Sequence, residues 1–176
     1  MEVRAPADEG EIRLAWQMLS RSFGWPLADE EKFVEGIGPL ERCRVAVVDG
    51  EVAAFSRLRP FGQFHGGRRV AMGGHSPVGV GPEFRGRGLG TTITAAHYDA
   101  MRERGEVLAA LYPATTRLYR GAGFEIAGVW SERTFPIRSL QMLPPGGGSL
   151  RPRRARREDV AAVKDCYRRC AATHPG

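Results

Sequence analysis

The pattern of apolar and polar residues predicts a short strand and then an amphipathic helix at the start of the chain. Residues 3–5 form the strand, and residues 8–23 form the helix, whose helically spaced apolar positions are Ile12, Ala15, Trp16 and Leu19. Acidic residues in its first turn suit the positive end of a helix. The tripeptide Gly24-Trp25-Pro26 ends this helix, and Asp29 caps a second one that we expect to end within residues 36–39.

The middle of the chain reads as an antiparallel sheet that leads into further helices. Residues 44–49 and 51–57 are two strands joined by Asp49-Gly50, a dipeptide typical of a tight hairpin. The remaining expected elements are strands at 68–72 and 74–80, a helix at 88–104, a strand at 107–112 buried on both faces, a short helix at 116–120, and closing strands at 124–129 and 133–137.

A glycine-rich, doubly basic segment follows the strand at 74–80. Residues 78–90 read V-G-V-G-P-E-F-R-G-R-G-L-G, so an apolar strand passes through three closely spaced glycines into a helix start. Gly86, Gly88 and Gly90 would let the backbone approach an anion, and the first N–H groups of the helix are unpaired donors. The pattern predicts a cradle for a pyrophosphate.

Two well-known phosphate loops do not fit this segment. The dinucleotide fingerprint G-x-G-x-x-G fails because its last position, counted from Gly86, is Thr91. The P-loop requires G-K-[ST], but the lysines of this chain are Lys32 and Lys164. Both classes of nucleotide site are excluded.

Two motifs together resemble the GNAT N-acetyltransferases. The first is R-x-x-G-x-G at Arg85, Gly88 and Gly90, which resembles the coenzyme A loop of that superfamily. The second is Y-x-x-x-G-F at Tyr119, which follows an apolar strand and lies one helix length after the first motif. The resemblance implies an α/β (α+β) GNAT acyl-CoA N-acyltransferase fold, in which a mixed central sheet has helices on both faces and a splayed pair of strands that binds the cofactor.

Within the superfamily, residues 110–128 resemble the Eis-like (enhanced intracellular survival) branch, and the resemblance extends over nearly the whole chain. Eis-like proteins have two GNAT-type domains and a further C-terminal domain. We therefore expect residues 1–148 to be a GNAT domain. Residues 149–176 would be a linker with the opening strand and helix of a truncated second domain, the helix being capped at Glu158-Asp159. The branch also implies a homo-oligomer for a full-length form.

The resemblance assigns roles to individual residues. Main-chain groups of Val78 and Val80 would bind the pantetheine arm of acetyl-CoA, and Tyr119 would be the general acid that protonates the leaving thiolate. The base of Eis-like enzymes is their own C-terminal carboxylate, so His75 on the cradle strand is the alternative here, against a default of a satisfied or solvent-facing histidine. The residues expected to hold the pyrophosphate are Arg85, Arg87, Gly88, Gly90 and Thr91.

The expected acceptor is a primary amine, either an aminoglycoside-like polyamine or a lysine side chain. Trp25 and Asp29, with the neighbouring acids Glu30 and Glu31, are candidates for attracting a cationic substrate, although acids in a first helical turn are also ordinary capping. A catalytically silent domain that binds acyl-CoA for a structural or sensing role is the alternative function.

Composition excludes several other classes. The net charge is +6, but most of it lies in residues 149–176, which hold seven arginines and one lysine against three acids. No aromatic residue interleaves with the run R-P-R-R-A-R-R at 151–157, so we expect no nucleic-acid partner. Apolar runs long enough for a membrane span or a signal peptide are missing, which predicts a cytoplasmic protein without a membrane partner. Cys43, Cys166 and Cys170 show no C-x-x-C spacing. Cys166, Cys170 and His174 recur at every fourth residue, a spacing more typical of a half-buried helix stripe than of a zinc site, and we expect no metal.

Overall fold

The computed structural model describes residues 1–142, 151 and 153–173. The described chain divides into two compact units, the first formed chiefly by residues 1–125 and the second by residues 126–171. None of the helices in the described residues is both long enough and apolar enough to cross a membrane.

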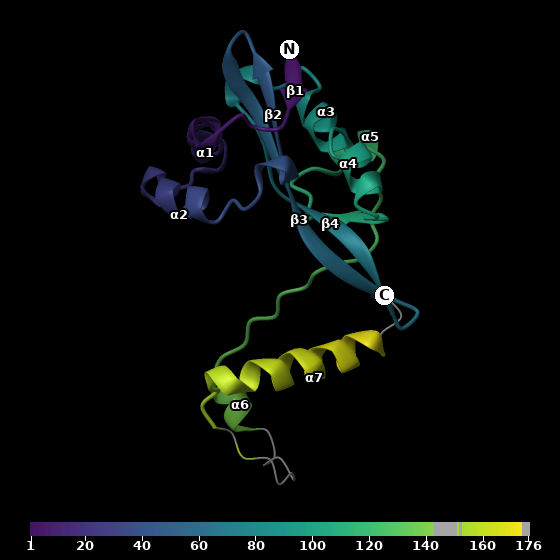
Figure 1. Ribbon diagram of the computed structural model, residues 1–176. Coiled ribbons are helices and arrows are strands. Elements are labelled where there is room, and N and C mark those ends of the chain that lie inside the picture. The colour runs from purple at the N-terminus through teal and green to yellow at the C-terminus, as the bar shows by residue number, and fades with distance from the viewer. Residues whose placement is uncertain (143–150, 152, 174–176) are drawn as a thin grey trace. The chain divides into compact units, whose positions relative to one another are not determined.

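A five-stranded sheet forms the centre of the first unit (Figure 1), and its strands lie in the order of the sequence. Neighbouring strands are antiparallel except for the last pair, β4 and β5, which is parallel. The strands are β1 (Glu2–Arg4), β2 (Cys43–Val48), β3 (Glu51–His65), β4 (Arg68–Val80) and β5 (Leu108–Ala110).

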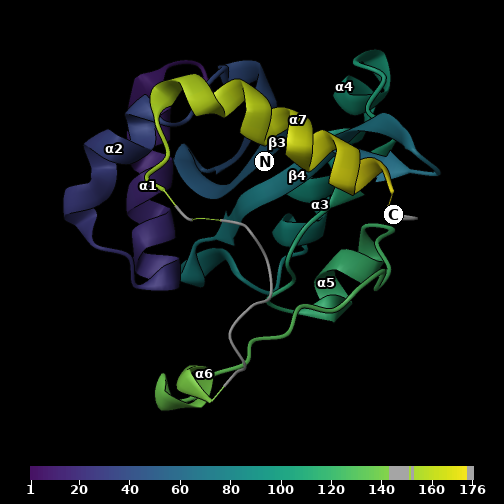
Figure 2. The same cartoon turned by 90° about the horizontal axis from the view of Figure 1, so that it is seen from below.

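Helices cover both faces of this sheet, as Figures 1 and 2 show. One face carries α1 (Glu9–Phe23) and α2 (Glu30–Glu35), and the other carries α3 (Leu89–Ala95), α4 (Tyr98–Glu103) and α5 (Thr116–Gly121). Short 3-10 turns at Leu27–Asp29, Leu40–Arg42 and Pro82–Phe84 connect the elements. A mixed sheet with helices on both faces confirms the predicted fold class.

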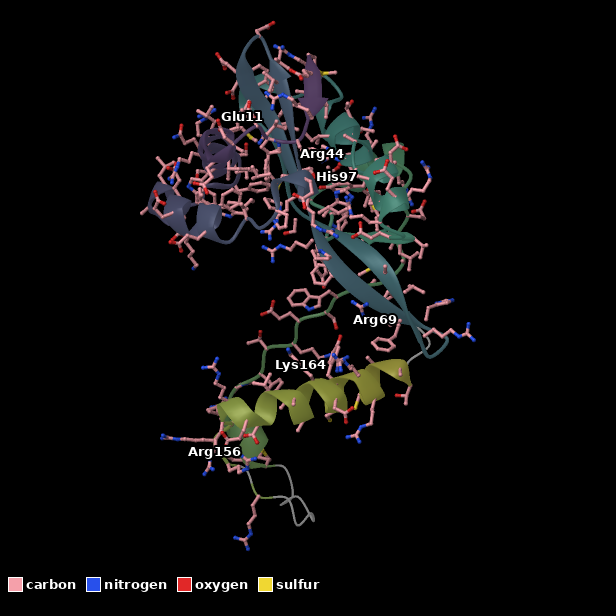
Figure 3. All side chains as sticks on the ribbon, viewed as in Figure 1. Glu11, Arg44, Arg69, His97, Arg156 and Lys164 are labelled. Carbon is pink, nitrogen blue, oxygen red and sulfur yellow. The ribbon has the colours of Figure 1, made fainter. Side chains whose placement is uncertain are left out.

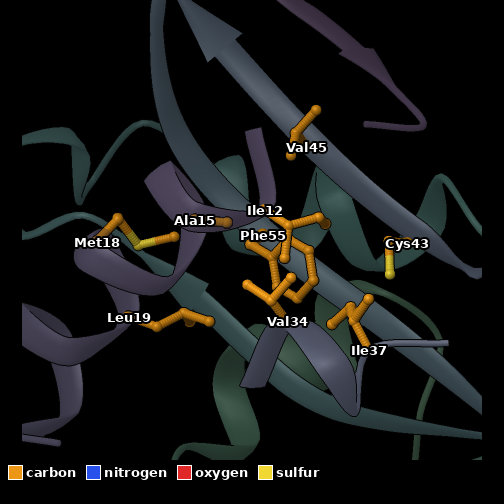
Figure 4. Packing of buried hydrophobic residues seen from close by; sticks show 9 residues of the cluster. All are labelled: Ile12, Ala15, Met18, Leu19, Val34, Ile37, Cys43, Val45 and Phe55. Atoms are coloured by element: carbon orange, nitrogen blue, oxygen red, sulfur yellow. The ribbon is translucent and has the colours of Figure 1, made fainter. Parts of the chain in front are cut away.

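Helix α1 begins and ends as its sequence predicts. The Asp8 carboxylate accepts a hydrogen bond from the N–H of Glu11 at 3.0 Å, and Gly24 ends the helix in the left-handed conformation with φ of 69°. Its apolar face packs on the sheet together with α2, and Figure 4 shows the resulting core around Phe55. The residues drawn there are Ile12, Ala15, Met18, Leu19, Val34, Ile37, Cys43, Val45 and Phe55.

Four expected elements have different bounds in the structure. Strand β3 continues through the glycine-containing segment to His65, and β4 is one strand rather than two. The helix expected at 88–104 is two helices, separated at Ala96 and His97. The break coincides with a side-chain contact, because the guanidinium of Arg44 donates to the Ala96 carbonyl at 3.1 Å; Figure 3 labels Arg44 and His97. An arginine on a distant strand could not be anticipated from helical periodicity.

The region after α4 corrects the sequence analysis most. The strand at 107–112 is only β5, and its apolar residues are exposed rather than buried on both faces: Val107 is 71% and Tyr112 is 88% accessible. The two strands expected at 124–129 and 133–137 are not formed, and residues 124–136 have no regular structure. Alternating apolar residues form a strand only where another strand or face covers them, whereas Val129 is 96% accessible.

The second unit contains α6 (Arg138–Gln141), a 3-10 turn at Arg157–Asp159 and α7 (Val160–Ala172). Asp159 opens the long helix, since its carboxylate accepts from the N–H of Arg156 at 2.8 Å and pairs with Arg153 at 2.7 Å. The short basic strand expected before this helix is wrong for residues 151 and 153–156, which are irregular. The proline- and glycine-rich stretch at 144–149, whose composition is typical of a linker, lies outside the described residues.

Candidate functional site

The glycine-rich segment after β4 has the backbone conformation of an open turn. Gly86 and Gly88 are exposed and have φ of +79° and +77°, values that residues with a Cβ rarely adopt. Gly88 is the residue before α3. A Cβ at either glycine would meet no atom within 4 Å, so both are required by backbone conformation and the space beside them is open.

Two arginines flank this turn and leave their charges at the surface. The Arg85 guanidinium is exposed and its Nε donates to the Val80 carbonyl at 3.4 Å. The Arg87 guanidinium carbon lies 5.5 Å from the centre of the Phe84 ring, which holds it beside the turn. Both guanidinium groups therefore lie at the surface beside the exposed backbone of Gly88.

Gly90 and Thr91 differ from the other predicted cradle residues because they face α5. Gly90 is buried, and a Cβ there would overlap the side chain of Leu118. The Thr91 hydroxyl donates to the Leu118 carbonyl at 3.4 Å. These two residues therefore position α5. Their expected contact with a pyrophosphate stays a prediction.

The edge of β4 that runs toward the cradle is open. Strand β5 pairs with β4 only between Met72 and Gly74, so no strand among the described residues covers the stretch that follows. The N–H of Gly81 donates to Ala53 on β3 at 2.9 Å. Because main-chain groups alternate along an antiparallel strand, those of Val78 and Val80 point away from β3, toward the open edge.

One of these outward groups already has partners that the sequence did not reveal. The Val80 carbonyl accepts a hydrogen bond from the Ser22 hydroxyl at 3.1 Å, besides the one from Arg85. The N–H and C=O of Val78 and the N–H of Val80 remain available at the edge. Strand β5 thus pairs with β4 only between Met72 and Gly74, and the splayed strand pair that the family resemblance implies stays a prediction.

Tyr119 lies on α5, the helix that Gly90 and Thr91 position. Its side chain is 9% accessible, and burial raises the pKa of its hydroxyl, which keeps the phenol protonated at neutral pH. The hydroxyl makes no hydrogen bond to any described residue. A further contact, from the Tyr98 hydroxyl to the Ala122 carbonyl, fixes the end of the helix.

A chain of ring contacts connects Tyr119 to a buried histidine pair. Phe124 packs edge-on against Tyr119 at 6.1 Å and against His75 at 5.6 Å, measured between ring centres. His75 in turn contacts His97, with the ring centres 5.2 Å apart. The role of His97 was not foreseen, because a single histidine within a helical pattern gives no signal of its surroundings.

Both histidines are held neutral. His75 is 4% and His97 0% accessible, and burial lowers the pKa of His75 to about 4 and that of His97 to about 3. The His75 Nδ1 lies 3.4 Å from the Ser56 hydroxyl, whereas its Nε2 and both nitrogens of His97 have no partner among the described residues. His75 is thus neither satisfied nor solvent-facing, and a group with so low a pKa is a weak base at pH 7.

The two predicted substrate residues lie on the opposite face, beside α1 and α2. The Trp25 ring stacks on Trp16 at 5.6 Å and on Phe23 at 4.7 Å, and Asp29 is exposed. The neighbouring acids Glu30 and Glu31 both pair with Arg13, at 3.1 and 2.5 Å. Two of the three expected acids are therefore already neutralised.

Metal ligands do not gather anywhere in the described part of the chain, where no group of three or more His, Cys, Asp or Glu residues could hold a metal ion. Cys166 and Cys170 are exposed on α7, and His174 lies outside the described residues.

Residues 3–127 match the family model described as the acetyltransferase (GNAT) domain. The chain belongs to the GNAT acetyltransferase family. Members of this family use acetyl-CoA as cosubstrate.

Solved structures agree with the family assignment. A GCN5-related N-acetyltransferase from Anabaena variabilis is 37% identical, with a TM-score of 0.66 over 72% of this chain and 33% of that chain. One from Kribbella flavida is 35% identical, with a TM-score of 0.61 over 68% of this chain and 32% of that chain. The chain thus spans about a third of the length of these two relatives.

Eis1 from Mycobacterium abscessus shares the fold, with a TM-score of 0.60 at 23% identity over 68% of this chain and 30% of that chain. A comparison with curated proteins found no match.

Proposed function

We propose that this GNAT domain transfers an acetyl group from acetyl-CoA directly to a primary amine, as part of an Eis-like enzyme. The observation that carries the proposal is the open edge of β4, which leads straight into the glycine turn. An extended, amide-rich ligand arm can replace the missing strand there, because an edge strand offers unpaired N–H and C=O groups.

The residues of the site fit coenzyme A. Val78 and Val80 would bind the amides of the arm with their outward main-chain groups, and Arg85 and Arg87 would pair with the pyrophosphate beside Gly88. The open space at Gly86 and Gly88 supports close approach of an anion to the backbone. Bound acetyl-CoA supplies an activated thioester.

Tyr119 is proposed as the general acid. When a neutral amine attacks the thioester carbonyl, a C–N bond forms and the C–S bond breaks, so the departing sulfur needs a proton and the amine must lose one. The Tyr119 hydroxyl has a proton to give, since burial raises its pKa and it makes no hydrogen bond to any described residue. We assign no residue of the described chain as the base.

The lack of an effective base among the described residues favours a second function, silent binding of acyl-CoA. His75 is the base that the sequence suggests within this chain, and its pKa of about 4 makes it a poor base at pH 7. The resemblance to Eis-like proteins supports the enzymatic proposal, with aminoglycoside-like polyamines or lysine side chains as the acceptors it suggests.

One experiment separates the two functions. Calorimetry measures acetyl-CoA binding, and thiol release measures turnover against a panel of primary amines. The enzymatic proposal expects saturable binding together with amine-dependent thiol release. Binding without release for any amine would support the silent function, and no binding would overturn both.

A further inference from the structure

The strand β3 carries an arginine, Arg57, beside the proposed reaction site. Ser56 pairs with Val78 and Leu58 pairs with His75, so β4 has two residues, Ser76 and Pro77, where β3 has only Arg57. This bulge lies just beyond Gly74, the last residue of β4 that pairs with β5. Arg57 therefore opposes the point at which the two cofactor-binding strands separate.

The side chain of Arg57 extends to the face that α3, α4 and α5 do not cover. It lies two residues after Phe55 on the same strand and therefore shares the face of Phe55, which is buried against α1 and α2. Its Nη2 lies 3.5 Å from where a Cβ of Gly38 would be, in the segment that follows α2. The cradle and Tyr119 occupy the other face, so an amine acceptor has the α1 and α2 face from which to approach.

No acidic side chain compensates Arg57. It is half-buried, yet it makes no hydrogen bond or ion pair within residues 1–142, 151 and 153–173. Burial, followed by the positive charge of Arg59, lowers the pKa of Arg57, and no carboxylate contributes to its surroundings. Cys43, which also adjoins it, has its pKa raised to about 11 by burial and carries no charge at pH 7.

Carboxylates of the first unit either have other partners or form no ion pair with Arg57. Glu41 acts electrostatically on Cys43 but forms no ion pair with Arg57 among the described residues. Glu106 is bound by Arg42 at 2.8 Å and by Arg104 at 3.0 Å, and Glu30 and Glu31 are bound by Arg13. A half-buried guanidinium without a carboxylate is desolvated without compensation. An anionic group on a ligand would compensate it, and the planar guanidinium would bind a carboxylate through two parallel hydrogen bonds.

We propose that Arg57 binds an anionic group of the acceptor, so that the preferred substrate is a primary amine that also carries a carboxylate. This inference rests on the proposed function and narrows its substrate class. A polycationic acceptor would meet the unpaired charges of Arg57 and Arg59, which disfavours the aminoglycoside-like polyamines suggested by resemblance.

Three primary amines of the same length test this proposal: 4-aminobutanoate, 4-aminobutanamide and 1,4-diaminobutane. Their affinities for the chain saturated with coenzyme A are measured by calorimetry, and their KM values by thiol release where turnover occurs. We expect the carboxylate to bind at least about tenfold more tightly than the amide or the diamine. Equal affinities, or no binding of the carboxylate, would overturn the proposal.

Two variants and a control assign the preference to Arg57. Arg57→Gln removes the preference for the carboxylate, Arg57→Lys keeps part of it, and Arg68→Gln, at the exposed end of the β3–β4 hairpin, leaves it unchanged. A preference that survives Arg57→Gln would contradict the assignment. Should that variant not fold, a preference of the unaltered chain that is insensitive to salt would contradict it equally, because ion pairing is screened by salt.

The proposed function can fail separately from this inference. If the unaltered chain does not bind acetyl-CoA, the proposed function is overturned. Normal acetyl-CoA binding without a carboxylate preference overturns only the role of Arg57.

Discussion

Gly90 of α3 lies directly against Leu118 of α5, and no side chain larger than hydrogen fits between them. The contact joins the two recognisable motifs of the sequence, because Gly90 belongs to the glycine-rich loop and Leu118 is next to Tyr119. Substitution at Gly90 should therefore displace α5, the helix that carries Tyr119, whereas substitution at Gly88 should act on the glycine turn.

Gly90→Ala is expected to destabilise the domain by about 1–3 kcal/mol, since it overpacks a buried contact. Displacement of α5 should lower turnover more than acetyl-CoA affinity. Urea unfolding, calorimetry and thiol release measure the three quantities. An unchanged unfolding free energy would show that the two helices are not in contact.

Gly88→Val is expected to weaken acetyl-CoA binding by at least about tenfold, because φ of +77° is strained for a branched residue and its side chain would occupy the open space beside the turn. The control is Gly66→Val, at a turn with φ of +55° at the other end of β4. It should lose similar stability but retain its affinity. Equal affinity losses in both variants would place the effect in folding rather than binding.

Tyr119→Phe should lower turnover by roughly tenfold to a thousandfold and leave acetyl-CoA affinity nearly unchanged, because only the proton donor is lost. The ring contact with Phe124 persists in the variant. Steady-state thiol release and calorimetry report the two effects. Parallel losses in both would instead make Tyr119 a packing residue.

The histidine pair predicts that the domain loses stability below about pH 6.5. The unfolded chain protonates both histidines near their ordinary pKa of 6.5, whereas burial lowers the pKa to about 4 for His75 and about 3 for His97 in the folded state. More protons are therefore bound by the unfolded state in this window. The free energy of unfolding should fall by up to about 1.4 kcal/mol per pH unit per histidine as the pH decreases toward 4.

Urea unfolding at pH 7 and pH 5 measures this loss. His97→Leu should make the pH dependence shallower, since it removes one of the two histidines whose pKa is lowered in the folded state. The same analysis of His65→Gln, at an exposed site, provides the control. A pH dependence that His97→Leu leaves intact would assign the effect to other groups.

Local signals in the sequence were sufficient for the elements that carry their own caps and turns. Asp8 and Gly24 bound α1, and Asp49-Gly50 forms the hairpin between β2 and β3, because each of these residues acts within a few positions of itself. The cradle was predicted for the same reason. Gly86 and Gly88 permit the positive φ that this turn adopts, and that property belongs to the residues themselves.

Features that depend on distant residues were not predictable. The break between α3 and α4 coincides with the contact of Arg44 on β2, and the buried His97 contacts His75 on β4. Apolar residues at 107–112 and 124–137 gave a strand pattern, but a pattern cannot supply the neighbouring strand that would bury them. The lack of a carboxylate beside Arg57 is visible only when all surrounding elements are in place.

The hydrogen bond from Ser22 to the Val80 carbonyl has a consequence for the order of events at the site. A second link, between Arg21 and Glu83 at 3.0 Å, joins the same end of α1 to the turn before the cradle. The chain continues from there through Gly24 to Trp25, on the acceptor face. Binding of acetyl-CoA at the cradle would thus stiffen the segment that carries Trp25. We therefore expect the enzyme to bind acetyl-CoA first and the amine second.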